Sequence, residues 1–275
     1  MSVRFIETWK DQSTRMIEWG DRRKCTILLL HGLGGTADSW TEVGELLKRE
    51  YHVVAVDLPG HGRSTALQKL SKETLIEWLL EVVKLLRKDS VVLMGHSLGA
   101  EISIYFNEEN PGKVDKLILV DGGYLRDEDF GESLQDVKQA VSQHIRNHRF
   151  SSWEEYLQDQ RSHPRWNALL EASAISAMVE EDSKVCLRLR EETALQYAKT
   201  VHVSPACERL HPTLEKPEKY LVIVSRRPKE VNPIRDRGVE RLNAEITVHY
   251  MDTSHEVCME DPIGLVEKVK GWLGS

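Results

Sequence analysis

The sequence is poor in cysteine and has no long apolar run. Its four cysteines are widely separated and form no C-x-x-C pair, so neither a disulfide framework nor a zinc site is expected. No stretch approaches the ~18 consecutive apolar residues that a membrane-spanning helix needs, and the first residues carry no signal-peptide core. These absences predict a cytoplasmic protein that has no membrane partner.

An excess of positive charge is also lacking. Lysine and arginine together number 37, aspartate and glutamate 44, and the formal net charge is -7. Such a chain is not typical of proteins that bind the phosphates of nucleic acids. No H-E-x-x-H, G-x-G-x-x-G or P-loop motif is found, so neither a metal nor another cofactor is predicted. The expected partner is a small-molecule substrate, and a homodimer is left open.

Short β-branched runs alternate with helical patterns in the first part of the chain. Residues 3–9 and 14–19 predict a hairpin with its turn at 10–13. Continuous apolar runs typical of strands buried on both faces lie at 26–30, 53–58, 91–94 and 117–120. Helical patterns lie between them, at 40–48, 71–86 and 100–107. This alternation predicts an α/β fold with a mostly parallel sheet of about eight strands and helices on both faces.

The pattern changes between residues 122 and 217, where we find no convincing strand. Helical periodicity there lies near 134–145, 152–160, 168–178 and 191–199. Alternation then resumes, with strands expected at 220–224 and 246–251 and helices at 235–242 and 262–273. We therefore expect one core formed by residues 1–121 and 218–275, interrupted by a helical cap at 122–217.

The segment Gly95-His96-Ser97-Leu98-Gly99 matches G-x-S-x-G, the pattern of a nucleophile elbow. A predicted buried strand precedes it and a predicted helix follows it, which is the setting that the motif needs. The sharp turn would lift the Ser97 hydroxyl into the cleft at the carboxyl ends of the strands, where open α/β sheets bind ligands. Ser97 is therefore the candidate nucleophile.

A serine nucleophile needs a base and donors for an oxyanion. His255 follows the last predicted strand by a short loop and comes last in the chain, as the order serine, acid, histidine requires. One donor would be the backbone N–H of Leu98, directly after the nucleophile. The other would come from the glycine-rich turn at 31–35, where Leu33 is the candidate.

Four motifs together resemble the α/β-hydrolase superfamily, in particular its capped serine hydrolases. They are HGLGG at 31–35, DLPGHGRS at 57–64, GHSLG at 95–99 and DTSH at 252–255. The resemblance includes esterases and meta-cleavage-product hydrolases and implies a Ser-acid-His triad. A serine at 97 argues against the epoxide hydrolases and haloalkane dehalogenases of the superfamily, which carry aspartate there.

The acid of the triad is the open point. The resemblance places it in a G-x-x-D pattern after the strand that follows the cap, but residues 224–233 read VSRRPKEVNP and contain no aspartate. Asp121, at the end of the strand before the cap, and Glu230 are the two substitutes. A third alternative is that no acid is present, which would make the protein slow or inactive.

The function that these residues favour is hydrolysis of a carboxylic ester, or a similar acyl bond, of a small to medium substrate through an acyl-enzyme on Ser97. Two alternatives remain at this point. One is a C–C bond hydrolase of dienoic acids. The other is a catalytically weak ligand-binding protein on the same fold.

Overall fold

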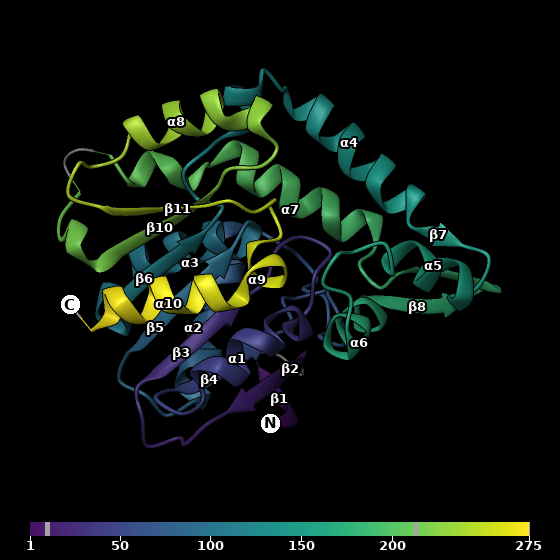
Figure 1. Cartoon of the computed structure of the whole chain (residues 1–275), viewed down its shortest axis with the longest axis horizontal. Helices are drawn as coiled ribbons and strands as arrows, with labels where there is room; N and C mark the ends of the chain where they lie inside the picture. Colours follow the sequence, from purple (N-terminus) through teal and green to yellow (C-terminus); the bar gives the residue numbers. More distant parts are fainter. Residues whose placement is uncertain (9–11, 212–213, 275) are drawn as a thin grey trace.

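A single eight-stranded sheet organises the computed structural model, which describes residues 1–8, 12–211 and 214–274 (Figure 1). β2 pairs antiparallel with both of its neighbours, β1 and β4, and the six strands from β4 to β11 pair parallel with one another. The predicted α/β fold with a mostly parallel sheet is therefore confirmed. The strands, in spatial order, are β1 (Ser2–Thr8), β2 (Gln12–Trp19), β4 (His52–Val56), β3 (Thr26–Leu30), β5 (Val91–His96), β6 (Val114–Val120), β10 (Tyr220–Ser225) and β11 (Thr247–Met251).

The predicted N-terminal hairpin is confirmed, although its second strand begins two residues earlier than expected, at Gln12. Part of the expected turn, residues 10 and 11, lies outside the described residues.

Helices cover both faces of this sheet. The helices α2 (Lys72–Leu85) and α3 (Leu98–Glu109) pack into one apolar cluster, with Leu28, Val54 and Leu93 of the sheet. The helices α1 (Thr41–Leu47) and α10 (Pro262–Leu273) pack into the other, and the short α9 (Val257–Glu260) lies beside α10. Because β3 to β6 are buried on both faces, their continuous apolar runs are explained.

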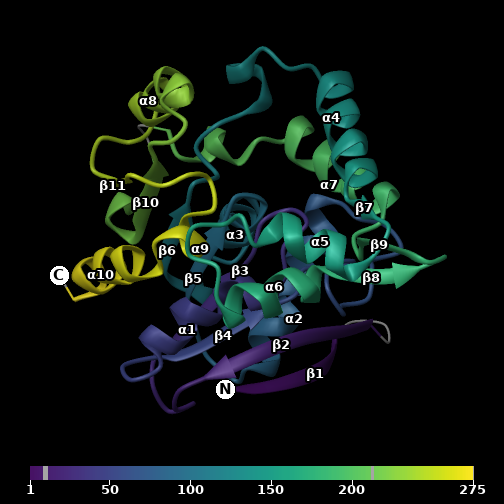
Figure 2. The same cartoon turned by 45° about the vertical axis from the view of Figure 1, so that its right-hand side comes forward.

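The segment between β6 and β10, which we call the inserted segment (residues 122–217), gathers on one side of the sheet in both views (Figures 1 and 2). Its helices are η4 (Asp127–Phe130), α4 (Leu134–Asn147), α5 (Trp153–Gln160), α6 (Ala168–Ala177), α7 (Glu191–Val203) and η5 (Ala206–Arg209). After η6 (Pro217–Lys219) the chain returns to the sheet, and η7 (Lys229–Val231) and α8 (Asn232–Glu240) follow β10.

The expectation that the inserted segment contains no strand is wrong. It holds a three-stranded sheet of β7 (Arg149–Phe150), β8 (Met178–Glu181) and β9 (Lys184–Leu187), in the order β7-β9-β8. Asp182 and Ser183 form the two-residue loop between β8 and β9, and both have positive φ, 50° and 57°. Such a turn matches the twist of a hairpin. The strands are too short for alternating polarity to reveal them.

Polar contacts fasten the inserted segment to the rest of the chain. The Arg165 guanidinium donates to Glu42 on α1 at 3.2 Å and to the carbonyl oxygen of Met259 at 2.7 Å. The hydroxyls of Ser176, on α6, and Thr36 lie 2.5 Å apart. Within the described ranges, no helix combines the length and the apolar character that crossing a membrane requires.

Leu29→Ala tests how much the central strand contributes to stability. Leu29 is fully buried in β3, so the cavity left behind should lower the free energy of unfolding by about 2–5 kcal/mol. Leu46→Ala is the matched control, because Leu46 lies exposed on α1 and its loss should change stability by no more than about 0.5 kcal/mol. Urea denaturation measures both, and equal effects would contradict this placement of the core.

Candidate active site

Ser97 lies on a strained turn between β5 and α3. Its backbone has φ 51° and ψ -117°, a conformation that costs a non-glycine residue free energy. The turn closes because its glycines allow close contact. A Cβ on Gly95 would lie 2.2 Å from the Gly99 carbonyl oxygen, and one on Gly99 would lie 2.3 Å from that of Leu30. The two outer positions of the GHSLG motif therefore have to be glycine for this turn to form.

The glycine-rich turn at 31–35 lies against this elbow. It follows β3, which neighbours β5 in the sheet, so both connections leave the same edge. A Cβ on Gly32 would lie 3.2 Å from Cβ of Ser97, which shows how closely the two turns approach. Leu33 lines the same cavities as Ser97. Leu98 is the first residue of α3, where backbone N–H groups have no acceptor within the helix.

His255 and Asp121 form a hydrogen-bonded pair beside this turn. Asp121 Oδ2 lies 2.7 Å from His255 Nδ1, and because a carboxylate only accepts, the ring donates its Nδ1–H. The same carboxylate accepts from the Ser225 backbone N–H at 2.9 Å, the Ser225 hydroxyl at 2.7 Å and the Tyr124 hydroxyl at 3.0 Å. Asp121 is only 7% exposed, and these four donors satisfy it. This arrangement fixes the imidazole tautomer and leaves Nε2 without the proton.

The pair shifts both pKa values in the directions expected for an ion pair. Burial alone would raise the pKa of Asp121, but the hydrogen bond and charge of His255, with the Ser225 donors, lower it to about 2. Desolvation alone would lower the pKa of His255, but the hydrogen bond to Asp121 and its negative charge raise it above the ordinary value. The imidazole is thus prepared to accept a proton.

The backbone of the His255 loop is held by the residue before the serine. The His96 Nε2–H donates to the carbonyl oxygen of His255 at 2.8 Å, and the two rings lie 4.7 Å apart. Burial lowers the pKa of His96, which therefore stays neutral beside His255. His96, the second position of the motif, thus positions the loop that carries His255.

Glu230 is not brought to this pair. It lies exposed on η7, and it is not among the residues that line the cavities around Ser97. The carboxylate bonded to His255 is that of Asp121. Arg235, on α8, lies 4.0 Å from the same carboxylate and adds a positive charge behind it.

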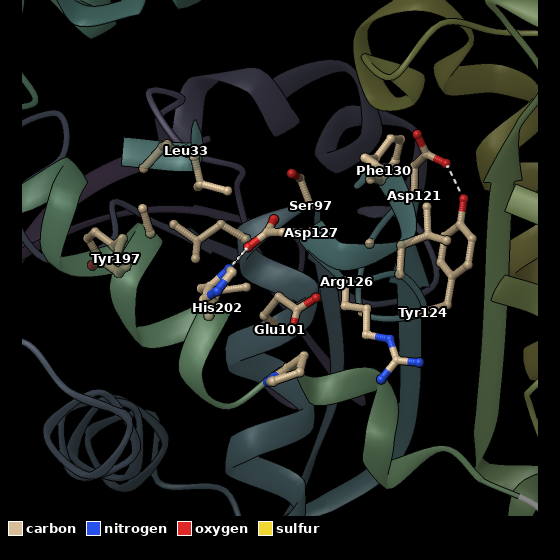
Figure 3. A pocket seen from close by; sticks show the side chains of 18 of the residues that line it. Leu33, Ser97, Glu101, Asp121, Tyr124, Arg126, Asp127, Phe130, Tyr197 and His202 are labelled. Atoms are coloured by element: carbon tan, nitrogen blue, oxygen red, sulfur yellow. Dashed lines mark hydrogen bonds and ion pairs between the residues drawn. The ribbon is translucent and has the colours of Figure 1, made fainter. Parts of the chain in front are cut away.

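Two cavities meet at Ser97 and His255. The first, of about 330 Å³, extends below the elbow between α3, η4 and α7, with Glu101, Arg126 and Phe130 in its wall (Figure 3). The second, of about 590 Å³, extends between the glycine-rich turn and α6 and is lined by His144, His163 and Trp166 among others. The core and the inserted segment both contribute to each cavity.

Sequence reasoning did not predict the contacts that several residues of this site make. Ser225, Tyr124 and His96 contact the Asp121–His255 pair, and Glu101 lines the first cavity. Ser225 and Tyr124 stand near predicted strand ends, which is a weak signal at best. The clearest signal is the position of Glu101 on the predicted helix, four residues after the serine.

Comparisons with known proteins identify the family and the fold. A family model described as the alpha/beta hydrolase fold matches residues 26–167, just over half of the chain. An (E)-2-((N-methylformamido)methylene)succinate hydrolase of Acinetobacter baylyi is 31% identical over 118 residues, which are 42% of this chain and 45% of that protein. The stretches aligned with this and similar curated relatives span less than half of each relative.

Solved structures share the fold along the whole chain at low identity. An E-2-(acetamidomethylene)succinate hydrolase has a TM-score of 0.76 and 16% identity, covering 100% of this chain and 99% of that one. A structure described with carboxylesterases of Nitrososphaera gargenis has a TM-score of 0.72 and 21% identity, with 98% of each chain covered. With the family match over β3 to β6 and Ser97, these likenesses lead to one conclusion: the chain belongs to the α/β-hydrolase family.

Proposed function

We propose that this protein is a serine hydrolase that cleaves a carboxylic ester, or a similar acyl bond, of a small to medium substrate through an acyl-enzyme on Ser97. The observation that carries the proposal is the Asp121–His255 hydrogen bond of 2.7 Å, together with the two cavities that His255 shares with a serine on a strained elbow. Asp121 takes the role of the acid.

The proposed reaction uses the side chains of Ser97, His255 and Asp121, two backbone N–H groups and a water molecule. As the Ser97 oxygen attacks the substrate carbonyl, His255 Nε2 takes the hydroxyl proton and Asp121 stabilises the imidazolium. The backbone N–H groups of Leu33 and Leu98 donate to the oxyanion. The C–O bond to the leaving alcohol breaks and His255 returns the proton to it. Water, deprotonated by His255, then attacks the acyl-enzyme, which releases the acid and restores the Ser97 hydroxyl.

We further propose that the inserted segment acts as a cap that encloses the substrate. Supporting this, Val141 of α4 lines both cavities, and α6 and α7 each line one of them. A substrate reaching Ser97 would be covered by these helices and largely removed from water, which strengthens the electrostatic contacts within the site.

The succinate-derived substrate named for the Acinetobacter relative is not the one we propose here. A succinate carries two carboxylates. The first cavity has four carboxyl side chains in its wall, those of Glu101, Asp121, Asp127 and Glu128, against two arginines, Arg126 and Arg235. Arg235 already faces Asp121. A substrate with little negative charge fits this balance better.

Labelling with a fluorophosphonate probe tests the nucleophile. We expect one covalent adduct on the Ser97 peptide, found by mass spectrometry, because the probe reacts with serines that a base activates. Ser97→Ala should abolish the adduct and His255→Ala should suppress it. Ser103→Ala, on the same helix but buried and bonded to the Gly99 carbonyl oxygen, is the control that should keep full labelling. Folded protein that does not label would contradict the proposal.

The pH profile of ester hydrolysis tests the acid. Only neutral His255 can take the serine proton, so kcat/KM should fall as the pH falls below the raised pKa of His255. Asp121→Asn removes the charge that raises this pKa, so the acid limb should move to lower pH and kcat should drop by up to ~10⁴-fold.

Glu230→Gln is the matched control for this experiment. It neutralises the rival carboxylate, which lies exposed on η7, and should leave both kcat and the acid limb unchanged. If Glu230→Gln rather than Asp121→Asn shifts the limb, the assignment of the acid is wrong.

A further inference from the structure

Glu101 is a buried carboxyl group in the wall of the substrate cavity that the proposed reaction does not use. It lies on α3 four residues after Ser97, so the two Cα atoms are about 6 Å apart along the helix axis. Glu101 is only 6% exposed, yet its side chain lines the first cavity together with Ser97 (Figure 3). His255 lines the same cavity.

The surroundings of Glu101 supply backbone donors, and the charge of Arg209 acts on it only from beyond ion-pair distance. The backbone N–H of Ala206 donates to Oε2 at 2.9 Å, and the Gly123 N–H donates to the same carboxyl group. Within the described part of the chain, no basic side chain forms an ion pair with it. The nearby basic groups are already engaged. His202 pairs with Asp127 at 2.8 Å, Arg209 pairs with Glu108, and Arg126 lies 3.5 Å from Asp129.

A carboxylate removed from water without a cation is costly, and the cost falls if a ligand brings the cation. Burial, with the negative charge of Asp127 nearby, raises the pKa of Glu101 to about 7. The group is therefore partly ionised at neutral pH, and a cation in the cavity would complete its ionisation. Tyr105 and Cys207, the other titratable neighbours of Glu101, are both held neutral by burial, since their pKa values are raised.

We propose that Glu101 is a specificity-determining residue that binds a protonated amine of the substrate. This inference rests on the proposed function, because it requires the ester carbonyl to lie at Ser97. The side of the ester that carries the ammonium group then lies in the first cavity. The substrate class is then a small ester with a primary ammonium group a few bonds from the carbonyl. Apolar side chains would accept the methylene groups between the two ends, namely Leu125, Phe130, Val137, Val141 and Val201.

A purely structural role for Glu101 would be to hold η5 and the turn at Gly123 against α3 through their backbone N–H groups. The two roles differ in what a glutamine would change. Glu101→Gln keeps one acceptor oxygen and the size of the side chain but removes the negative charge. A structural role predicts a lower melting temperature alone, whereas the proposed role predicts a loss of preference for cations.

The experiment compares two ligands of nearly equal size, n-pentylammonium and 1-pentanol, by ligand-observed NMR titration at about pH 8, where an alkylamine is still protonated. The wild-type protein should bind the ammonium ion at least about tenfold more tightly than the alcohol, as a charge-assisted hydrogen bond in a buried site would give. In Glu101→Gln the two dissociation constants should become nearly equal.

Glu128→Gln is the matched control, since Glu128 lines the same cavity but is exposed and should leave the wild-type preference intact. Equal binding of the two ligands by the wild-type protein would overturn the proposal, whether or not Glu101→Gln folds. So would a preference that survives in Glu101→Gln, or one that Glu128→Gln abolishes.

Binding does not require turnover, so this experiment stands apart from the test of Ser97. The titration is repeated with Ser97→Ala, which should keep the preference for the ammonium ion. If fluorophosphonate labelling fails while the preference holds, the proposed reaction is wrong and Glu101 still marks a cation site. If labelling succeeds and the preference is absent, only the inference about Glu101 fails.

Discussion

The buried carboxylate of Asp121 ties together segments that are far apart in the chain. It accepts hydrogen bonds from Ser225 at the end of β10, from Tyr124 at the start of the inserted segment and from His255 after β11. The left-handed backbone of Asp121, with φ 45°, ends β6 and turns the chain out of the sheet. Without these donors the buried charge would be costly, and without the charge the His255 ring would have no fixed orientation.

The second organising feature is the close approach of backbones around Ser97. A Cβ on Gly122 would lie 2.6 Å from Cα of Ser97, so the turn after β6 contacts the elbow directly. The turn after β3 contacts the same elbow, since a Cβ on Gly32 would lie 3.2 Å from Cβ of Ser97. The turns that follow three neighbouring parallel strands, β3, β5 and β6, therefore meet in one small volume. The proposed nucleophile, the proposed acid and the candidate oxyanion donors are positioned by the sheet itself, and the inserted segment contributes to the walls of the two cavities.

What the sequence predicted well depended on local or periodic signals. The buried strands and the elbow motif are of this kind, because apolar runs and small residues at fixed spacing report on contacts within a few residues. The three strands of the inserted segment have at most four residues each and give no such signal. The choice between Asp121 and Glu230 could not be made, since it depends on how β6 and β10 lie side by side. The environment of Glu101 could not be predicted either, because its carboxyl group accepts a hydrogen bond from Ala206, which lies 105 positions further along the chain.

The pairing of β6 with β10 has a consequence for how the chain acquires its structure during synthesis. The two strands are neighbours in the sheet, with Leu117 opposite Tyr220, yet the inserted segment separates them along the chain. Until β10 has left the ribosome, β6 is an unprotected sheet edge, of the kind that invites wrong pairing between nascent chains. The Asp121 carboxylate meanwhile stays in water. Pairing of β10 with β6 covers the edge, and the donors that follow β10 and β11 then bury the charge, so the site cannot form before both strands have been made.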